Sequence, residues 1–307
     1  MNMKIGIIGT GISVVGFLKN LKGSHDVKVF DKAFKLGGRL TMHRINHCKL
    51  NLGAQYINPQ SNEFKEVIIN AGCSPLNGSV IDAKTKEIVD SSNFFIHEDG
   101  LDTIVKKHLK YCDVLMGAKV TGIDLEKGKL IFENGDSELF DLIISSVPIQ
   151  QLEQLCEFDV SNENVYSKCI AIGALVKDKN SFKFNCYKNF SKAISWLALS
   201  SSFCSQSPIT LTAHLTPELS DNLFSSRNDQ IEKIATDDIV KRMNIKNNES
   251  IVPLKIFKWR YALCQRNNQG DGFVKLNKLI AIGDWTLGPR VESAYESGKK
   301  AAIALNI

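Results

Sequence analysis

Residues 4–31, KIGIIGTGISVVGFLKNLKGSHDVKVFD, decide the fold expected of this chain. The apolar run Lys4–Ile8 is typical of a buried strand, a Gly9-Thr10-Gly11 turn ends it, and Ile12–Leu21 has helical spacing. A second strand over Val27–Phe30 leads to an acid, Asp31. This order predicts a dinucleotide-binding βαβ unit. Gly9 permits the tight turn, Gly11 lets backbone N–H groups approach a pyrophosphate at the helix N-terminus, and Asp31 accepts hydrogen bonds from a ribose.

One position departs from the glycine pattern of such units. Val14 stands where the third glycine is expected, and the next glycine is Gly16. That third glycine normally allows close helix–strand packing, so we expect Val14 to push the helix slightly outward. On these residues alone, a Rossmann-like unit that binds no nucleotide remains an alternative.

Two further stretches favour a bound dinucleotide. Gly37-Gly38-Arg39 forms a flexible turn that presents a permanent cation, suited to a pyrophosphate. Near the C-terminus, a buried strand over Leu279–Ile282 precedes Gly283-Asp284-Trp285, and residues 288–294 open a helix that runs to the end of the chain. Asp284 is placed to bind a ribityl chain, and the helix N-terminus suits the negative charge of a reduced flavin.

Together these motifs resemble FAD-dependent enzymes of the amine oxidase superfamily, and more narrowly the bacterial renalase-like oxidases. The resemblance runs nearly end to end. Departures from the pattern are Val14, Asp31 where glutamate is commoner, and Asn51 where aspartate is frequent. Three further stretches agree with the narrower match: Leu52–Tyr56, Ile194–Ala198 and Lys258–Ala262.

The resemblance implies an α/β fold in which a Rossmann-like FAD-binding domain, of the amine oxidase and p-hydroxybenzoate hydroxylase type, carries an inserted α+β substrate domain. A meander over Ala118–Asp124, Lys129–Glu133 and Phe140–Ser145 is expected to return to the FAD-binding domain, with the backbone of Val120 against the adenine. The expected ranges are 1–57, 96–150 and 276–307 for the discontinuous FAD-binding domain, and 58–95 and 151–275 for the substrate domain.

The resemblance also implies which residues bind the ligands, with FAD held non-covalently and Gln55 at the edge of the flavin ring. For Trp259 and Tyr261, a strand end that merely covers the core is an equal alternative to a place in the pocket. Lys168 lies near the region of a flavin-adjacent lysine in amine oxidases, and we interpret it as solvated. The expected cofactor set is Gly9, Gly11, Ile12, Ser13, Asp31, Lys32, Gly38, Arg39, Gly53, Ala54, Gln55, Val120, Gly283, Asp284, Arg290, Val291, Glu292 and Ala294, and the expected substrate set is Tyr56, Trp196, Trp259, Tyr261 and Trp285.

The function implied is an oxidase that takes hydride from a dihydropyridine, such as an isomeric dihydro-NAD(P), and passes the electrons to O₂. No motif pairs a nucleophile with a base, and flavin chemistry needs none, because the flavin itself accepts the hydride. An amine or polyamine oxidase is the first alternative. A flavin-binding protein without turnover, acting as a sensor or assembly factor, is the second.

Composition narrows the class of protein. With 307 residues, 43% hydrophobic and 23% charged, the chain is long enough for a sizeable core and is not disordered. Its 38 basic residues are scattered among 33 acidic ones, which argues against nucleic acid as a partner, and it has no apolar run long enough to span a membrane.

Eight dispersed cysteines without C-x-x-C predict reduced thiols, no metal site and a cytoplasmic location. Residues 1–18 imitate a secretory signal, but their glycines and the lack of a small-residue cleavage site favour the strand and turn.

Overall fold

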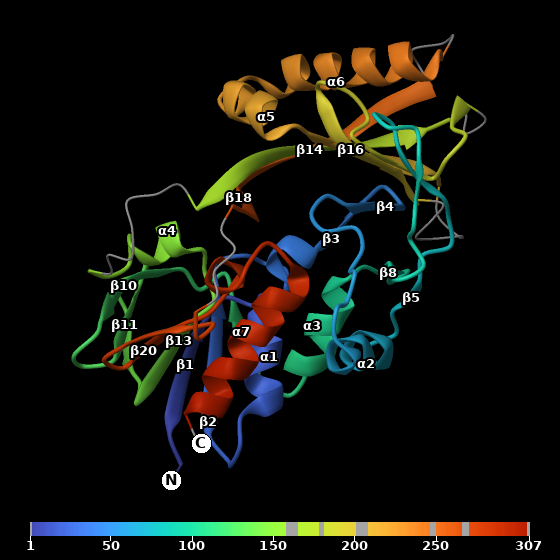
Figure 1. Ribbon diagram of the computed structural model, residues 1–307. Helices are drawn as coiled ribbons and strands as arrows, with labels where there is room; N and C mark the ends of the chain where they lie inside the picture. The colour runs from blue at the N-terminus through green and yellow to red at the C-terminus, as the bar shows by residue number, and fades with distance from the viewer. Residues whose placement is uncertain are drawn as a thin grey trace. The chain divides into compact units, whose positions relative to one another are not determined.

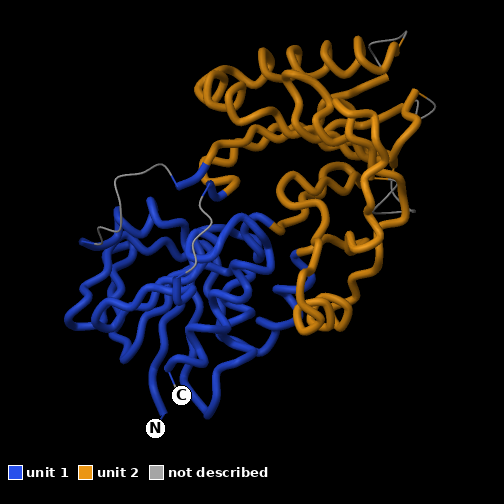
Figure 2. The backbone as a smooth tube through the Cα atoms, viewed as in Figure 1, with its two compact units in different colours: residues 1–39, 102–166, 264–307 blue, residues 40–101, 167–263 orange. Residues whose placement is uncertain are grey.

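The structure is a computed structural model that describes residues 2–157, 165–177, 181–200, 208–245, 250–265 and 270–305. The chain divides into two compact units, shown in Figure 2: unit 1 comprises residues 1–39, 102–166 and 264–307, and unit 2 comprises residues 40–101 and 167–263. Among the described residues, no helix is long and apolar enough to cross a membrane.

Unit 1 contains a six-stranded sheet in the order β19-β20-β13-β1-β2-β9, parallel except for the edge strand β19. The parallel strands alternate with helices along the chain, so the expected Rossmann-like α/β fold is confirmed. Figure 1 shows α1 and α7 side by side. The strands are β1 (Lys4–Ile8), β2 (Asp26–Asp31), β9 (Asp113–Met116), β13 (Leu142–Ser145), β19 (Val274–Leu276) and β20 (Leu279–Ala281), and the helices are α1 (Ile12–Asn20), α3 (Asp102–Leu109), α4 (Ile149–Leu152) and α7 (Val291–Ala304).

A separate three-stranded antiparallel sheet in unit 1 consists of β10 (Val120–Asp124), β11 (Lys129–Phe132) and β12 (Ser137–Leu139). The expectation that Phe140–Ser145 forms the third strand of this meander is wrong. Every residue of Leu142–Ser145 is buried, and a strand buried on both faces belongs inside a parallel sheet. This strand is β13, which pairs with β1 and β20.

Unit 2 is built on a seven-stranded sheet in the order β18-β14-β17-β16-β15-β6-β7. One face carries α5 (Pro217–Leu223) and α6 (Asn228–Met243), whose apolar residues join Leu197, Leu211 and Leu215 in a buried core. The remaining elements are α2 (Asn62–Asn70), β3 (Met42–Ile45), β4 (Cys48–Asn51), β5 (Ser74–Pro75), β6 (Val80–Asp82), β7 (Ile88–Val89), β8 (Phe95–Ile96), β14 (Tyr166–Val176), β15 (Cys186–Lys188), β16 (Ile194–Leu199), β17 (Thr210–Leu215) and β18 (Ile251–Cys264).

The boundaries between the two units differ from the expected domain boundaries. The expected FAD-binding ranges were 1–57, 96–150 and 276–307, and the expected substrate-domain ranges were 58–95 and 151–275. Residues 40–57 lie in unit 2, because Leu50 and Leu52 pack on Ala171 of its sheet. Residues that follow 150 still belong to unit 1, where the Ile123 N–H donates to the Leu155 carbonyl (2.7 Å). Assignment of FAD to unit 1 and of substrate to unit 2 stays a prediction.

Candidate functional site

The glycine turn lies at the carboxyl end of β1, in the middle of the parallel sheet of unit 1. Gly9 has φ +93°, a conformation that L side chains rarely adopt, and its N–H donates to the Phe30 carbonyl (2.7 Å). Gly11 is the N-cap of α1, where no side chain caps the helix. A Cβ at Gly11 would meet nothing nearer than Ser13 Oγ at 3.9 Å, so the space in front of the first turn is open.

Asp31 lies beside this turn, at the end of β2. Its carboxylate accepts hydrogen bonds from Thr10 Oγ1 (2.6 Å) and from the Ala33 N–H (2.9 Å). The same Thr10 hydroxyl accepts from the Gly37 N–H (3.3 Å), which ties the second glycine turn to the first. The expected residues of both turns therefore lie close together, at the edge of the sheet where α/β proteins bind nucleotides.

Arg39 and Asp284 form a bidentate ion pair. Arg39 Nη1 donates to Asp284 Oδ2 (2.7 Å), Nη2 donates to Oδ1 (2.8 Å), and the Tyr166 hydroxyl donates to the same Oδ1 (2.5 Å). Burial alone would lower the pKa of Arg39, but the Asp284 carboxylate outweighs it and raises the pKa. Burial is the largest cause that raises the pKa of Tyr166, and the Asp284 carboxylate raises it further. The sequence placed Arg39 at the pyrophosphate and Asp284 at the ribityl chain without foreseeing that they bind each other; those roles stay predictions.

Close packing occurs between α1 and α7. A Cβ at Gly16 would lie 2.0 Å from the Tyr295 carbonyl oxygen, and one at Gly298 would lie 1.8 Å from the Ser13 carbonyl oxygen. Val14 is fully buried. The two glycines thus bring the backbones of α1 and α7 together, and α7 begins directly after Arg290.

The expected cofactor residues are divided between the units. Gly53, Ala54 and Gln55 lie in unit 2, and all the others lie in unit 1. Val120 is buried at the start of β10, Lys32 is exposed just after β2, and Gly283 (φ +152°) donates its N–H to Ser297 Oγ (2.8 Å). The first turn of α7 carries the remaining members, Val291, Glu292 and Ala294.

In unit 2, Gln55 is 4% exposed and joins two other side chains. Its Oε1 accepts from Trp196 Nε1 (3.1 Å), which fixes the orientation of the amide, and its Nε2 lies 3.4 Å from His214 Nε2. His214 Nε2 also lies 3.1 Å from the Leu52 carbonyl, which can only accept, so this nitrogen carries the proton of that bond. Burial lowers the pKa of His214 to about 4, against the opposing effect of the Leu52 carbonyl, so the imidazole is neutral at pH 7.

The expected substrate residues have distinct surroundings. Tyr56 stacks on Phe94 (centroids 4.1 Å apart) and contacts Trp196 (5.4 Å). Trp259 donates to the Leu52 carbonyl (2.9 Å) and packs on the core. Tyr261 follows it on β18, and Trp285 is buried in unit 1. Tyr56 and Trp196 adjoin Gln55, whereas the contacts of Trp259 match the alternative of a residue that covers the core.

Lys168, His43 and His47 lie elsewhere in unit 2. Lys168 Nζ forms a surface ion pair with Asp221 (2.6 Å). His43 and His47 belong to the β3–β4 hairpin, where the ring of His43 packs at a tilt against Phe257 (centroids 5.2 Å apart).

Sequence reasoning missed His214 and the threonines before it on β17. Their signal was present, because Thr210-Leu211-Thr212-Ala213-His214 alternates polar and apolar residues. The same period places Trp196 and Ala198 on one face of β16, where they pair with His214 and Thr212.

Comparisons with known proteins agree with this geometry. A family model of the NAD(P)-binding Rossmann-like domain matches residues 7–68. Mouse renalase (Mus musculus) is 28% identical over 141 residues, which cover 41% of this chain and 40% of renalase. The match therefore spans less than half the length of that relative.

Solved structures match the whole chain. A putrescine oxidase variant superposes with a TM-score of 0.77 at 10% identity, covering 100% of this chain and 99% of the other. A fatty acid isomerase from P. acnes gives 0.70 at 11% identity, with 99% of both chains covered. At such identities these likenesses define the fold, and the two neighbours catalyse different reactions on it.

The parallel sheet and the glycine turn define a protein with a Rossmann-like nucleotide-binding fold, the fold that the putrescine oxidase variant also has. Within that fold, part of the chain is similar in sequence to renalase.

Proposed function

We propose that the chain is an FAD-dependent oxidoreductase that binds FAD non-covalently through unit 1. The observation that carries this proposal is the open space in front of Gly11, at the N-terminus of α1 and beside the carboxylate of Asp31. A helix N-terminus with backbone N–H groups that have no intrahelical partner is an anion site, and a pyrophosphate is the anion that this motif binds.

The residues around the turn fit such a ligand. N–H groups of Ile12 and Ser13, in the first turn of α1, would bind the pyrophosphate, and Asp31 would accept from the adenosine ribose. Arg39 and Asp284 form a rigid polar pair within the same unit, available to the pyrophosphate and the ribityl hydroxyls. When bound, FAD would supply a two-electron acceptor at its ring.

We propose further that the donor is a dihydropyridine, such as an isomeric dihydro-NAD(P), and that O₂ takes the electrons. Such a donor becomes aromatic as hydride leaves, so the protein need only orient it and needs no general base. The surroundings of Gln55 support this, because His214 is neutral and its Nε2 is bound to a carbonyl. Gln55 and Trp196 form one fixed unit, suited to orienting a planar ring.

The experiment has two stages. The absorption spectrum of purified protein, with and without added FAD, measures flavin uptake. Protein that stays colourless after FAD is added would refute the cofactor proposal. Anaerobic stopped-flow bleaching of the flavin by isomeric dihydro-NAD(P), beside a panel of alkylamines, then tests the donor.

We expect rapid bleaching by a dihydropyridine at a rate that changes little between about pH 6 and 8. A protonated amine would instead give a rate that rises steeply with pH as its neutral form appears. Bleaching by an amine alone would identify an amine oxidase, and bleaching by neither would favour a protein without turnover.

A further inference from the structure

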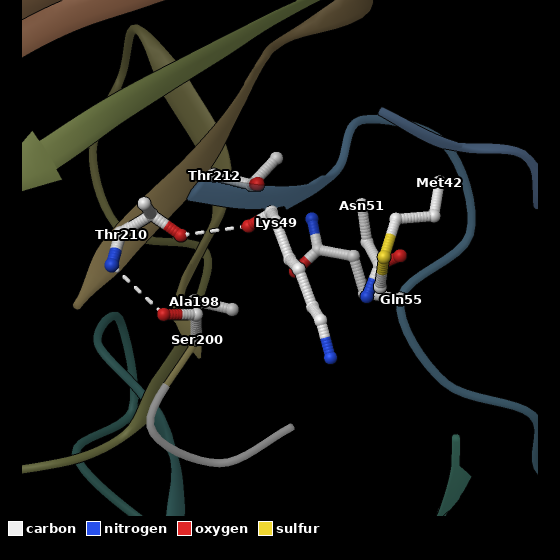
Figure 3. Close-up of a pocket in the computed structure, with 8 residues that line it drawn as sticks. All are labelled: Met42, Lys49, Asn51, Gln55, Ala198, Ser200, Thr210 and Thr212. Carbon is white, nitrogen blue, oxygen red and sulfur yellow. Dashed lines mark hydrogen bonds between the residues drawn. The ribbon is translucent and has the colours of Figure 1, made fainter. Parts of the chain in front are cut away.

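The pocket of unit 2 that Figure 3 shows is too small to hold a ligand. It has room for about one water molecule, and residues of its lining take part in hydrogen bonds within the protein. Thr210 Oγ1 donates to the Lys49 carbonyl (3.0 Å), and Ser200 Oγ accepts from the Thr210 N–H (2.8 Å). These bonds connect β17 to its neighbours, so the role of this pocket is structural.

A buried hydroxyl group lies at the proposed FAD site in unit 1. Thr10 separates Gly9 and Gly11 in the first glycine turn, and its side chain is almost inaccessible, because the residue is 1% exposed. Backbone N–H groups bind the phosphates at such a turn, and the glycine pattern places no demand on the side chain between the two glycines. The burial of this threonine therefore has a cause outside the glycine pattern.

The hydrogen bonds of Thr10 have a defined direction. An ionised carboxylate can only accept, so Thr10 Oγ1 donates its single hydrogen to Asp31 Oδ2 (2.6 Å). The lone pairs of the same oxygen accept from the Gly37 N–H (3.3 Å). The first bond is short and has a charged acceptor, whereas the second is long and joins neutral groups. The bond to Asp31 is therefore the stronger of the two.

The Asp31 carboxylate is held at both of its oxygens. Oδ2 accepts from Thr10, and Oδ1 accepts from the Ala33 N–H (2.9 Å). A carboxylate can accept about four hydrogen bonds, so capacity for about two remains for the hydroxyl groups of a ribose. Because the plane of the carboxylate is fixed before a ligand arrives, binding loses less side-chain entropy at Asp31.

We propose that Thr10 is a positioning residue of the nucleotide site. Its hydroxyl orients the Asp31 carboxylate for the adenosine ribose and, more weakly, holds the second glycine turn at Gly37. The hydroxyl is buried and its hydrogen is committed to Asp31, so Thr10 acts on the ligand through that carboxylate. This inference rests on the proposed binding of FAD by unit 1.

Titration of FAD into the full chain stripped of its flavin, followed by flavin fluorescence, tests this role without turnover. Thr10→Val nearly keeps the shape of the side chain and removes the hydroxyl, so we expect FAD to bind roughly tenfold more weakly. Thr10→Ser keeps the hydroxyl and should bind FAD within about threefold of the wild-type protein. Thr103→Val is the matched control at a partly buried position of α3 in the same unit, and it should leave the affinity unchanged.

Competition by ADP shows whether Thr10 acts through Asp31. Thr10→Val should weaken ADP roughly tenfold but 2′,3′-dideoxy-ADP less than about threefold, because the dideoxy nucleotide has no ribose hydroxyl for Asp31 to bind. In a background of Asp31→Ala, Thr10→Val should cause little further loss of ADP affinity. Equal losses for both nucleotides, or independent effects of the two substitutions, would overturn the inference.

The outcomes separate this role from the proposed function. If the wild-type protein binds FAD and Thr10→Val binds it equally well, FAD binding stands and the role of Thr10 is wrong. If the protein takes up no FAD but binds ADP with the expected dependence on Thr10 and Asp31, the FAD proposal falls and the role of Thr10 stands. Binding of neither FAD nor ADP overturns both.

Circular dichroism checks that each variant is folded. If Thr10→Val does not fold, Thr10→Ala provides the same loss of the hydroxyl with less bulk. Failure of both variants to fold, beside a folded Thr10→Ser, would make the hydroxyl a requirement of folding and would also overturn the inference.

Discussion

Substitution of Gly16 by alanine sets two opposing effects against each other. Alanine in a helix interior is favoured over glycine by about 1 kcal/mol, so an unpacked helix would gain stability. In α1 the new Cβ would lie 2.0 Å from the Tyr295 carbonyl oxygen, a backbone atom of α7 that cannot rotate away. The two helices must therefore separate, at a cost of about 1–3 kcal/mol for overpacking plus the loss of buried contact between them.

We expect the steric effect to exceed the propensity gain, which gives a net loss of about 2 kcal/mol in the free energy of unfolding. For a chain of 307 residues that corresponds to a fall in Tm of roughly 3 °C. Thermal unfolding followed by circular dichroism measures it, with Lys19→Ala as the control, since this residue is exposed on the same helix. Gly298→Ala, whose Cβ would lie 1.8 Å from the Ser13 carbonyl oxygen, should behave like Gly16→Ala. A rise in Tm for both glycine variants would refute the close approach of α1 and α7.

Three further predictions concern single residues. Gly11→Val should abolish FAD uptake, because the new side chain fills the open space before α1. Val14→Gly should lower Tm by creating a cavity but leave the affinity for FAD similar. Equal effects of the two substitutions on FAD affinity would contradict this division of roles. Arg39→Ala should weaken FAD retention and lower the free energy of unfolding in urea by about 2 kcal/mol, because the buried Asp284 carboxylate loses its cation. The loss is no larger because the Arg39 side chain is 33% exposed and solvent screens the pair. Unchanged FAD retention would remove Arg39 from the site. The pKa of His214 is lowered to about 4 in the folded protein, so the unfolded chain binds more protons between about pH 6.5 and 4. The stability that this group contributes is present above about pH 6.5 and is lost as the pH falls through that window. The loss should reach about 2–3 kcal/mol, and His214→Gln should flatten the dependence in urea unfolding at pH 4.5–7.

The sequence predicted those parts of unit 1 in which the signals are local. The strand, glycine turn, helix and strand over residues 4–31 appear as β1, α1 and β2 with bounds within one residue or two. Such a unit is recognisable because turn chemistry and apolar period are both encoded in adjacent residues. The expected placement of Phe140–Ser145 in the meander was wrong because the pairing of this strand is not local. A short apolar run does not reveal whether its neighbour in the sheet is the preceding strand of a meander or the distant β1.

Long-range pairing also explains what was missed at the candidate sites. Arg39 and Asp284 are 245 residues apart, and each was assigned a separate ligand contact, because no local pattern shows that their side chains meet. Likewise Gln55 was expected at the flavin edge by resemblance, but its bond to Trp196 and its contact with His214 depend on β16 and β17 lying side by side.

The two faces of β16 and β17 show how one local rule has both a structural and a functional consequence. Alternation sends Leu197, Leu199, Leu211, Ala213 and Leu215 into the core beneath α5 and α6, where burial fixes the register of both strands. Once that register is fixed, the intervening residues have no freedom in position: Ala198 must pair with Thr212, and Trp196 with His214. The apolar face therefore positions the polar one. A slip of one residue would turn the threonines and His214 toward α5 and α6 and the leucines away from them, so the apolar core fixes where the polar side chains of the other face lie.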